Sequence, residues 1–216
     1  MTGFSGRCKL HTVIFSIEMY LGGFNVSWVI NNTDMSSETK LRLPIHNLAE
    51  RHYGLTPPVA NSYTEAARVC LDRHHVSPID FIVTDDGVDL DAIAEWKPTD
   101  DRQRAAWANE NDATRDGAYA CALAAVELTR GMVAVRRAEI KTGADYYVSR
   151  PGEAVEDLEK CYRLEVSGVD KGIPSTVQQR VREKLGQAAA GASNLPAIAG
   201  VVGFRAKLVV LKRLEE

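Results

Sequence analysis

Apolar and polar residues alternate as in strands at several places along the chain. Near the start, Lys9–Glu18 and Phe24–Asn31 are β-rich runs on either side of Gly22-Gly23, and they predict an antiparallel hairpin. A second hairpin is expected from Ile79–Thr84 and Val88–Lys97, because the Asp-Gly pair between them is a strong turn signal.

Helical spacing of apolar residues predicts four helices. A short one is expected over Leu41–Tyr53 and a better defined one over Ser62–His75. A long one should begin at Asp100 and reach about Thr129, with a polar interruption at Asn109–Asp112. Its second half is apolar nearly all round, so it should be buried. The last is expected from Pro174 to about Ala189.

The remaining apolar runs read as strands. Met132–Ile140 predicts one strand, Gly143–Gly168 two, and Ala197–Leu211 a long strand or a strand pair bent at one of its glycines. Together the pattern predicts an α/β protein with a mixed central sheet and flanking helices. We expect residues 1–60 to form an N-terminal β-hairpin extension and loop, and residues 61–216 to form a single compact core.

Composition places the chain among ordinary soluble globular proteins. Its 216 residues are 45% hydrophobic and 25% charged, and the net charge of -3 gives no general attraction to nucleic acid or to an anionic membrane. The longest apolar run, Ala118–Val126, is too short to cross a bilayer. The four cysteines are dispersed and form no C-x-x-C motif, which argues against zinc and disulfides and favours a reducing cytoplasm.

Two acidic residues in Gly143–Gly168 are candidates for a metal site. Asp145 lies at the first strand of this stretch and Glu165 on the second, where Tyr162, Leu164 and Val166 form the opposite, apolar face. If the strands pair, the two carboxylates can converge on one side of the sheet. Converging carboxylates form an oxygen-rich site suited to Mg²⁺ or Mn²⁺.

The order of the predicted elements from about Asp112 onward is helix, three strands, helix, strand. This order and the pair of acids resemble the PD-(D/E)XK nuclease superfamily, which has an αβββαβ restriction-endonuclease-like core. Ala144-Asp145 would stand for the PD and Glu165-Val166-Ser167 for the (D/E)XK. The resemblance covers about half of the chain and implies an Mg²⁺-dependent nuclease.

The resemblance also implies roles for further residues. Glu127, a lone acid in an apolar helix, would match the acidic residue that many members carry on the first core helix. Ser167 departs from the motif, because the family has a lysine there that helps to orient or activate the attacking water. Lys171, on the loop that follows, could reach back and fill this role; otherwise the site is altered or inactive.

An earlier stretch offers a competing match. Pro78-Ile79-Asp80 followed by Glu95-Trp96-Lys97 fits P-x-D and E-x-K, with Glu95 and Lys97 on one strand face. The stretch is crowded with other acids, however, as a solvated acidic hairpin would be. The later pair, Asp145 and Glu165, is therefore the favoured site.

A structural role for these acids is also open. Carboxylates on neighbouring strands are usually surface residues paired with lysine or arginine, and Arg163 is among the available partners of Asp145 and Glu165. Glu127 is open to the same structural interpretation, since a buried carboxylate is costly unless it is paired or metal-bound, and Arg130 is near it in the sequence.

The sequence supports two functions and leaves room for a third interpretation. The first is phosphodiester hydrolysis, with Asp145 and Glu165 holding the metal. Nucleic acid would then contact a local basic strip that includes Arg136, Arg137 and Lys141. The second is an inactive nuclease-fold subunit, a homodimer or part of a larger complex, that binds or assembles in a nucleic-acid-processing or defence system. The third is a small α/β protein of unrelated fold.

Overall fold

The computed structural model describes residues 16–21, 24–29, 40–153, 158–191 and 193–214, and for the first two ranges it describes only the backbone. The chain divides into two compact units, residues 1–39 and residues 40–216. In the first unit, β1 (Ser16–Leu21) pairs antiparallel with β2 (Phe24–Val29), with Leu21 opposite Phe24. The predicted hairpin is therefore present, while residues 9–15 of its first strand lie outside the described residues.

The second unit begins earlier than the expected boundary at residue 60. β3 (Leu41–Arg42) adds a short parallel strand beside β5 (Val88–Ala94), and α1 (Leu48–Arg51) follows it. Leu43, Ile45 and Leu48 are buried in the main core. The expected single helix over Leu41–Tyr53 is thus wrong in its first half, since these residues extend along the sheet edge before the chain turns.

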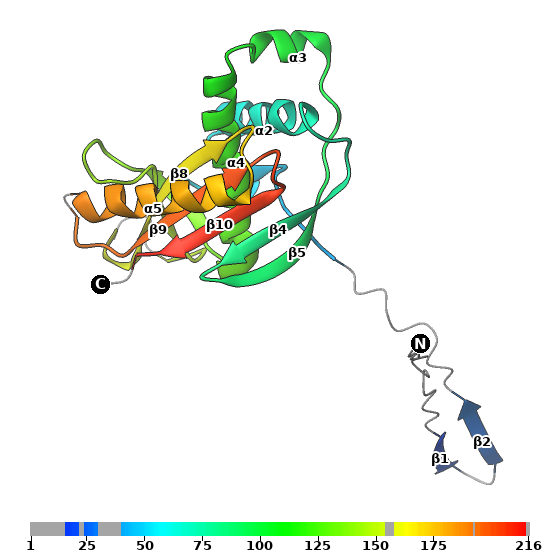
Figure 1. Ribbon diagram of the computed structural model, residues 1–216. Coiled ribbons are helices and arrows are strands. Elements are labelled where there is room, and N and C mark those ends of the chain that lie inside the picture. Colours follow the sequence, from blue (N-terminus) through cyan, green and yellow to red (C-terminus); the bar gives the residue numbers. More distant parts are fainter. Residues whose placement is uncertain (1–15, 22–23, 30–39, 154–157, 192, 215–216) are drawn as a thin grey trace, which may run out of the picture. The chain divides into compact units, whose positions relative to one another are not determined.

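The second unit is built on a mixed sheet of eight strands (Figure 1). Besides β3 and β5 they are β4 (Ile79–Asp85), β6 (Val133–Arg137), β7 (Tyr146–Ser149), β8 (Tyr162–Val169), β9 (Ala197–Gly203) and β10 (Leu208–Arg213). Their order in the sheet is β3-β5-β4-β10-β9-β8-β7-β6. The pairs β3–β5, β4–β10 and β8–β9 are parallel, and the other neighbouring pairs are antiparallel.

Besides α1, the helices of the second unit are α2 (Pro57–Asp72), α3 (Asp101–Ala106), α4 (Glu110–Arg130) and α5 (Pro174–Ala190). A 3-10 turn spans Leu158–Lys160. The predicted polar interruption of the long helix separates α3 from α4, where the Asn109 side chain accepts hydrogen bonds from the first turn of α4. Gly131 ends α4 in the left-handed conformation, with φ 62°.

The α4 helix is the centre of the main core, as its apolar second half predicts. Every residue from Gly117 to Val126 is buried, and the helix packs on the sheet on one side and on α2 on the other. Gly117 permits this packing, because a Cβ there would lie 2.8 Å from the Ala67 backbone nitrogen of α2. The small residues of α4 therefore let two helices and a sheet approach closely.

The α5 helix covers the opposite face of the sheet (Figure 1). Its residues Val177 and Val181 pack against Val201 of β9 and Val210 of β10 in a smaller second core. From α4 onward the elements run α4, β6, β7, β8, α5, β9, which is the predicted order. The last predicted stretch is a strand pair, because the chain turns after Gly203 and returns as β10. Among the described residues, no helix combines the length and apolar character that crossing a bilayer requires.

Candidate functional site

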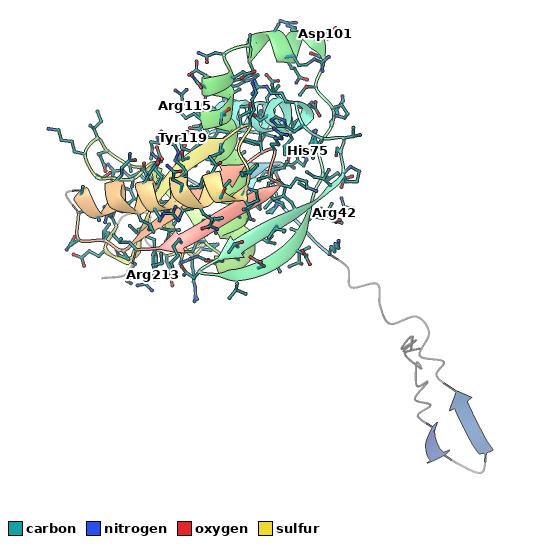
Figure 2. The ribbon with its side chains drawn as sticks, viewed as in Figure 1. Arg42, His75, Asp101, Arg115, Tyr119 and Arg213 are labelled. Carbon is teal, nitrogen blue, oxygen red and sulfur yellow. The ribbon has the colours of Figure 1, made fainter. Side chains whose placement is uncertain are left out.

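A cavity of about 390 Å³ opens where β7 begins beside β8, between the first half of α4 and α5. Arg115 and Tyr119 lie on successive turns of α4 at its wall (Figure 2). Both predicted metal ligands, Asp145 and Glu165, also line it. The described residues that line it are Asn111, Thr114, Arg115, Tyr119, Asp145, Glu165, Val166, Ser167, Gly168, Arg180 and Lys184.

Asp145 is held at the start of β7 by the pairing of the two strands. Its backbone N–H donates to the carbonyl of Leu164, at 2.8 Å. Its carboxylate then accepts two further hydrogen bonds of 2.8 Å, from the Tyr119 hydroxyl at Oδ1 and from the Val166 backbone N–H at Oδ2. Arg137 lies 3.5 Å from Oδ1. The carboxylate is therefore fixed in one orientation.

Glu165 faces the α5 side of the sheet, opposite to the buried Leu164 and Val166 on either side of it. There Lys184 of α5 donates a hydrogen bond of 2.7 Å to Oε1 and another of 2.8 Å to Gln187. The side chains of Glu165 and Lys184 are only 13% and 17% exposed. This is an ion pair sheltered from solvent, and such pairs are screened less than surface pairs.

The donor set of the cavity fits a hydrated divalent cation better than a fully protein-bound one. Within the described residues, no group of three or more acidic, histidine or cysteine side chains is placed to hold a metal ion. Asp145 Oδ2 accepts one hydrogen bond and so keeps a lone pair, and Glu165 keeps Oε2. Mg²⁺ is commonly held by one or two carboxylates while it retains several waters. The predicted pair of ligands is chemically suitable for that mode.

Lys171 does not reach the site, which corrects the role expected for it. Its ammonium group donates to Glu110 Oε2 at 2.7 Å, and its side chain is 61% exposed. The chain turns after β8 ends at Val169, and this turn carries Lys171 toward the start of α4, away from Glu165. The lysine that contacts Glu165 is Lys184, which the sequence analysis did not include in the site. It follows Val177 by about two helical turns, so it lies on the sheet-facing side of α5, and this spacing is a signal that could have identified it.

Glu127 is also outside the site. It accepts a hydrogen bond of 2.6 Å from Arg51 and lies 3.1 Å from His52 Nε2. It follows Tyr119 by about 12 Å along the axis of α4, at the other end of the helix. Its carboxylate is thus paired, as the structural interpretation required, although the partner is Arg51 and not Arg130. Arg130 instead contacts Asp85 and Asp86.

The competing residues of the second hairpin form surface ion pairs. Asp80 accepts a hydrogen bond of 2.7 Å from Lys40, and Glu95 pairs with Arg42. Lys97 is exposed, and its backbone carbonyl accepts from Arg68. The Asp80 side chain is 73% exposed. The three residues do not line the cavity that holds Asp145 and Glu165.

The structure separates the three basic residues expected to bind nucleic acid. Arg137 lies beside the site, with its guanidinium 4.6 Å from the ring centre of Tyr119 and 4.7 Å from that of Tyr146. Arg136 instead pairs with Glu139 at 2.7 Å, and Lys141 is exposed in the loop before β7. The basic residues that line the cavity are Arg115, Arg180 and Lys184.

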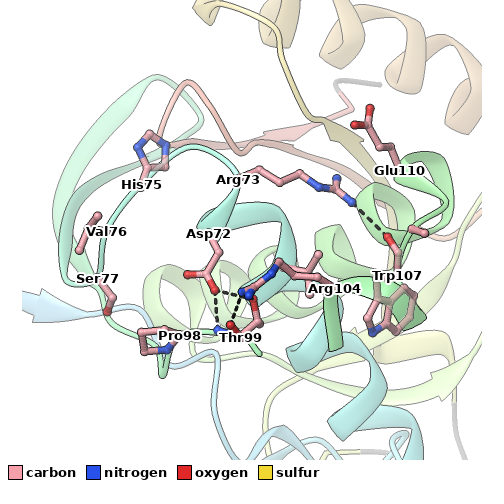
Figure 3. Close-up of a pocket in the computed structure, with 12 residues that line it drawn as sticks. Asp72, Arg73, His75, Val76, Ser77, Pro98, Thr99, Arg104, Trp107 and Glu110 are labelled. Carbon is pink, nitrogen blue, oxygen red and sulfur yellow. Dashed lines mark hydrogen bonds between the residues drawn. The ribbon is translucent and has the colours of Figure 1, made fainter. Parts of the chain in front are cut away.

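A larger cavity of about 550 Å³ lies between the end of α2 and the junction of α3 with α4 (Figure 3). Asp72, a partly buried acid of this cavity, accepts hydrogen bonds from the Trp96 indole at 2.5 Å and from the Thr99 backbone and hydroxyl at 2.6 Å each. Arg73 donates to the Trp107 carbonyl, as the dashed line in Figure 3 shows. These polar groups join α2 to the loop before α3, so they have a structural role.

Comparison with known proteins finds no family model, no curated protein and no solved structure that matches this chain.

Proposed function

We propose that this protein hydrolyses phosphodiester bonds of nucleic acid with a divalent cation held by Asp145 and Glu165. The observation that carries the proposal is that both carboxylates and a lysine line one cavity, where β7 begins beside the middle of β8. The order αβββαβ around them agrees with the resemblance to PD-(D/E)XK nucleases. A bound Mg²⁺ or Mn²⁺ would lower the pKa of a water ligand and neutralise charge on the phosphate.

The residues of the chain supply the rest of the chemistry. Lys184 is the only lysine that lines the cavity among the described residues, and it would orient the attacking water or stabilise charge on the phosphate. Lys184 of α5 would thus take the role of the motif lysine, which the family pattern places at position 167. Ser167 lines the same cavity and leaves space for the lysine from α5 to enter.

Two arginines of the cavity wall would hold the substrate. Arg115 comes from α4 and Arg180 from α5, so they approach the site from opposite faces of the sheet. Arg115 pairs with Asp112 and Arg180 with Glu183 in exposed ion pairs, and Arg115 also contacts the less exposed Asp116. Exposed pairs of this kind contribute about 0–1 kcal/mol, so a phosphate can replace the acidic partner.

The second candidate is a subunit that binds nucleic acid or assembles with other proteins without cleavage. It is favoured by Ser167 and by the ion pair of Glu165 with Lys184, because this pair competes with a cation for Glu165. The two functions differ in whether the cation binds and in whether cleavage follows.

The deciding experiment combines thermal melting with cleavage of single- and double-stranded oligonucleotides, each with and without Mg²⁺ or Mn²⁺. For the enzyme we expect the cation to raise the melting temperature, since it binds only the folded state, and cleavage to accompany it. Glu165→Gln keeps the size of the side chain and should abolish both effects. Glu95→Gln is the matched control on the other hairpin and should change neither.

Metal-linked stabilisation without cleavage would favour the binding subunit. Ser167→Lys then tests whether only the lysine is lacking, because this substitution should produce cleavage if the site is otherwise intact. If neither the wild type nor Ser167→Lys responds to the cation in either assay, the proposed metal site is wrong.

A further inference from the structure

Tyr119 of α4 contacts one of the two carboxylates of the candidate site directly. Its hydroxyl donates to Asp145 Oδ1 at 2.8 Å, and its ring is almost fully buried. An ionised carboxylate only accepts hydrogen bonds, so the Tyr119 hydroxyl is the donor in this contact. The contact therefore holds the Asp145 carboxylate by a directed hydrogen bond.

The orientation of Tyr119 is fixed by aromatic neighbours. Its ring centre lies 4.9 Å from that of Tyr63 and 5.7 Å from that of Tyr146. The hydroxyl groups of Tyr63 and Tyr146 contact each other at 2.9 Å. Arg137 stacks over the Tyr119 ring and donates to its hydroxyl at 3.1 Å. Because the phenol is held from several sides, it can fix the carboxylate that it contacts.

Hydrogen bonds distinguish the two oxygens of Asp145. Oδ1 accepts from Tyr119 and has Arg137 at 3.5 Å, so its two lone pairs both face donors. Oδ2 accepts only from the backbone N–H of Val166 and keeps one lone pair beside β8, the strand that carries Glu165. In Glu165, Oε1 accepts the hydrogen bond from Lys184. Each carboxylate thus offers a single oxygen to a cation.

We propose that Tyr119 is a positioning residue that makes Asp145 a one-oxygen ligand through Oδ2, so that the site takes a single divalent cation. This rests on the proposed function, because it concerns the same metal site. A second cation at bridging distance would need further carboxylate oxygens, and the described part of the chain places no third acidic side chain in the cavity.

The test is calorimetric titration with Mn²⁺ alone, on the full chain and without nucleic acid. We expect a single ion per chain in the wild type. Tyr119→Phe keeps the ring and its stacking but removes the donor, and it should weaken Mn²⁺ binding by about 10- to 100-fold, as is typical when an outer hydrogen bond to a metal ligand is lost. Tyr63→Phe is the matched control, since its hydroxyl contacts Tyr146 and Arg137 but not Asp145, and it should bind as the wild type does.

A second measurement uses terbium luminescence to detect an ion bound beside Tyr119. Tb³⁺ prefers oxygen ligands and emits when a nearby excited tyrosine transfers energy to it. Tyrosine-sensitised emission should appear in the wild type and in Tyr63→Phe but not in Glu165→Gln. At Tb³⁺ concentrations that saturate Tyr119→Phe, this variant should give much weaker emission, because its phenol is gone.

The outcomes separate this inference from the proposed function. If Mn²⁺ does not bind the wild type, the metal site itself is wrong and the inference falls with it. If Mn²⁺ binds the wild type but Tyr119→Phe binds equally tightly, the proposed function stands and the positioning role is overturned. Two ions per chain, both lost in Glu165→Gln, would overturn the single-cation inference alone.

Discussion

Lys184 on α5 and Glu165 on β8 are joined by a hydrogen bond of 2.7 Å, although 19 positions separate them in the sequence. The strand directs Glu165 toward the helix, and the helix returns across the sheet so that its lysine meets the carboxylate. This pair decides the chemistry open to the cavity, because it brings a proton donor and a potential metal ligand into one sheltered contact.

Lys184→Met should separate metal binding from cleavage. Removing the ammonium group frees Glu165 Oε1 and removes a positive charge, so Mn²⁺ should bind more tightly. Cleavage should nevertheless fall by about 100-fold or more if Lys184 stabilises charge on the phosphate as proposed. Titration calorimetry and an oligonucleotide cleavage assay measure the two effects. Lys171→Met is the control and should leave both near the wild-type values, since Lys171 contacts Glu110 outside the site.

Two glycine substitutions should have opposite effects on stability. Gly117→Ala places a Cβ within 2.9 Å of the Ala67 Cα, and backbone atoms cannot move aside easily. We expect a loss of about 1–3 kcal/mol from overpacking, despite the better helix propensity of alanine. Gly186→Ala on α5 meets no atom within 4 Å, so it should instead gain roughly 0.5–1 kcal/mol. Urea denaturation of the two variants checks both signs, and a stable Gly117→Ala protein would contradict the packing of α4 on α2.

His52 should make stability depend on pH near neutrality. The side chain is fully buried, its Nδ1 accepts from the Ala134 backbone N–H at 2.9 Å, and its Nε2 faces Glu127. Burial lowers the pKa of His52 below the usual 6.5, although the charge of Glu127 opposes this. The unfolded chain therefore takes up a proton first as the pH falls, so stability is retained above about pH 6.5 and is lost below it.

The measurement is urea denaturation at intervals between about pH 7.5 and pH 5, above the range in which ordinary carboxylates titrate. His52→Asn retains an acceptor for the Ala134 N–H but cannot titrate, so its stability should change less over this interval. Burial also lowers the pKa of His46, so His46→Gln serves as a comparison. Equal pH slopes for the wild type and His52→Asn would show that His52 is not the group responsible.

Nucleic-acid binding, if the proposed function is right, should depend on arginines of the cavity wall. Replacing Arg115 and Arg180 together by glutamine should weaken binding. The slope of log K against log salt concentration should also become less steep, by about 0.7–0.9 per lost phosphate contact. Arg136→Gln should have little effect, because Arg136 pairs with Glu139 away from the cavity. Fluorescence anisotropy at several salt concentrations checks this, and an unchanged slope in the double variant would exclude these two arginines.

Local sequence patterns determined most of the secondary structure and the two acids of the site. The alternation of side chains in Tyr162–Val169 places Glu165 opposite to Leu164 and Val166, and the pairing of β7 with β8 then sets the Asp145 backbone against Leu164. The Asp-Gly turn, the break at Asn109 and the end of α4 at Gly131 were also predictable, because each depends on backbone preferences of a few adjacent residues.

Tertiary structure decided which side chains join those acids. The sequence suggested Lys171 and Glu127 as further residues of the site. The turn after β8 instead carries Lys171 to Glu110, and the length of α4 carries Glu127 to Arg51. Lys184 and Tyr119 take their places at Glu165 and Asp145 because two helices pack on opposite faces of the same strands. Local patterns fix which face of a helix or strand a residue occupies, whereas the packing of whole elements determines what that face meets.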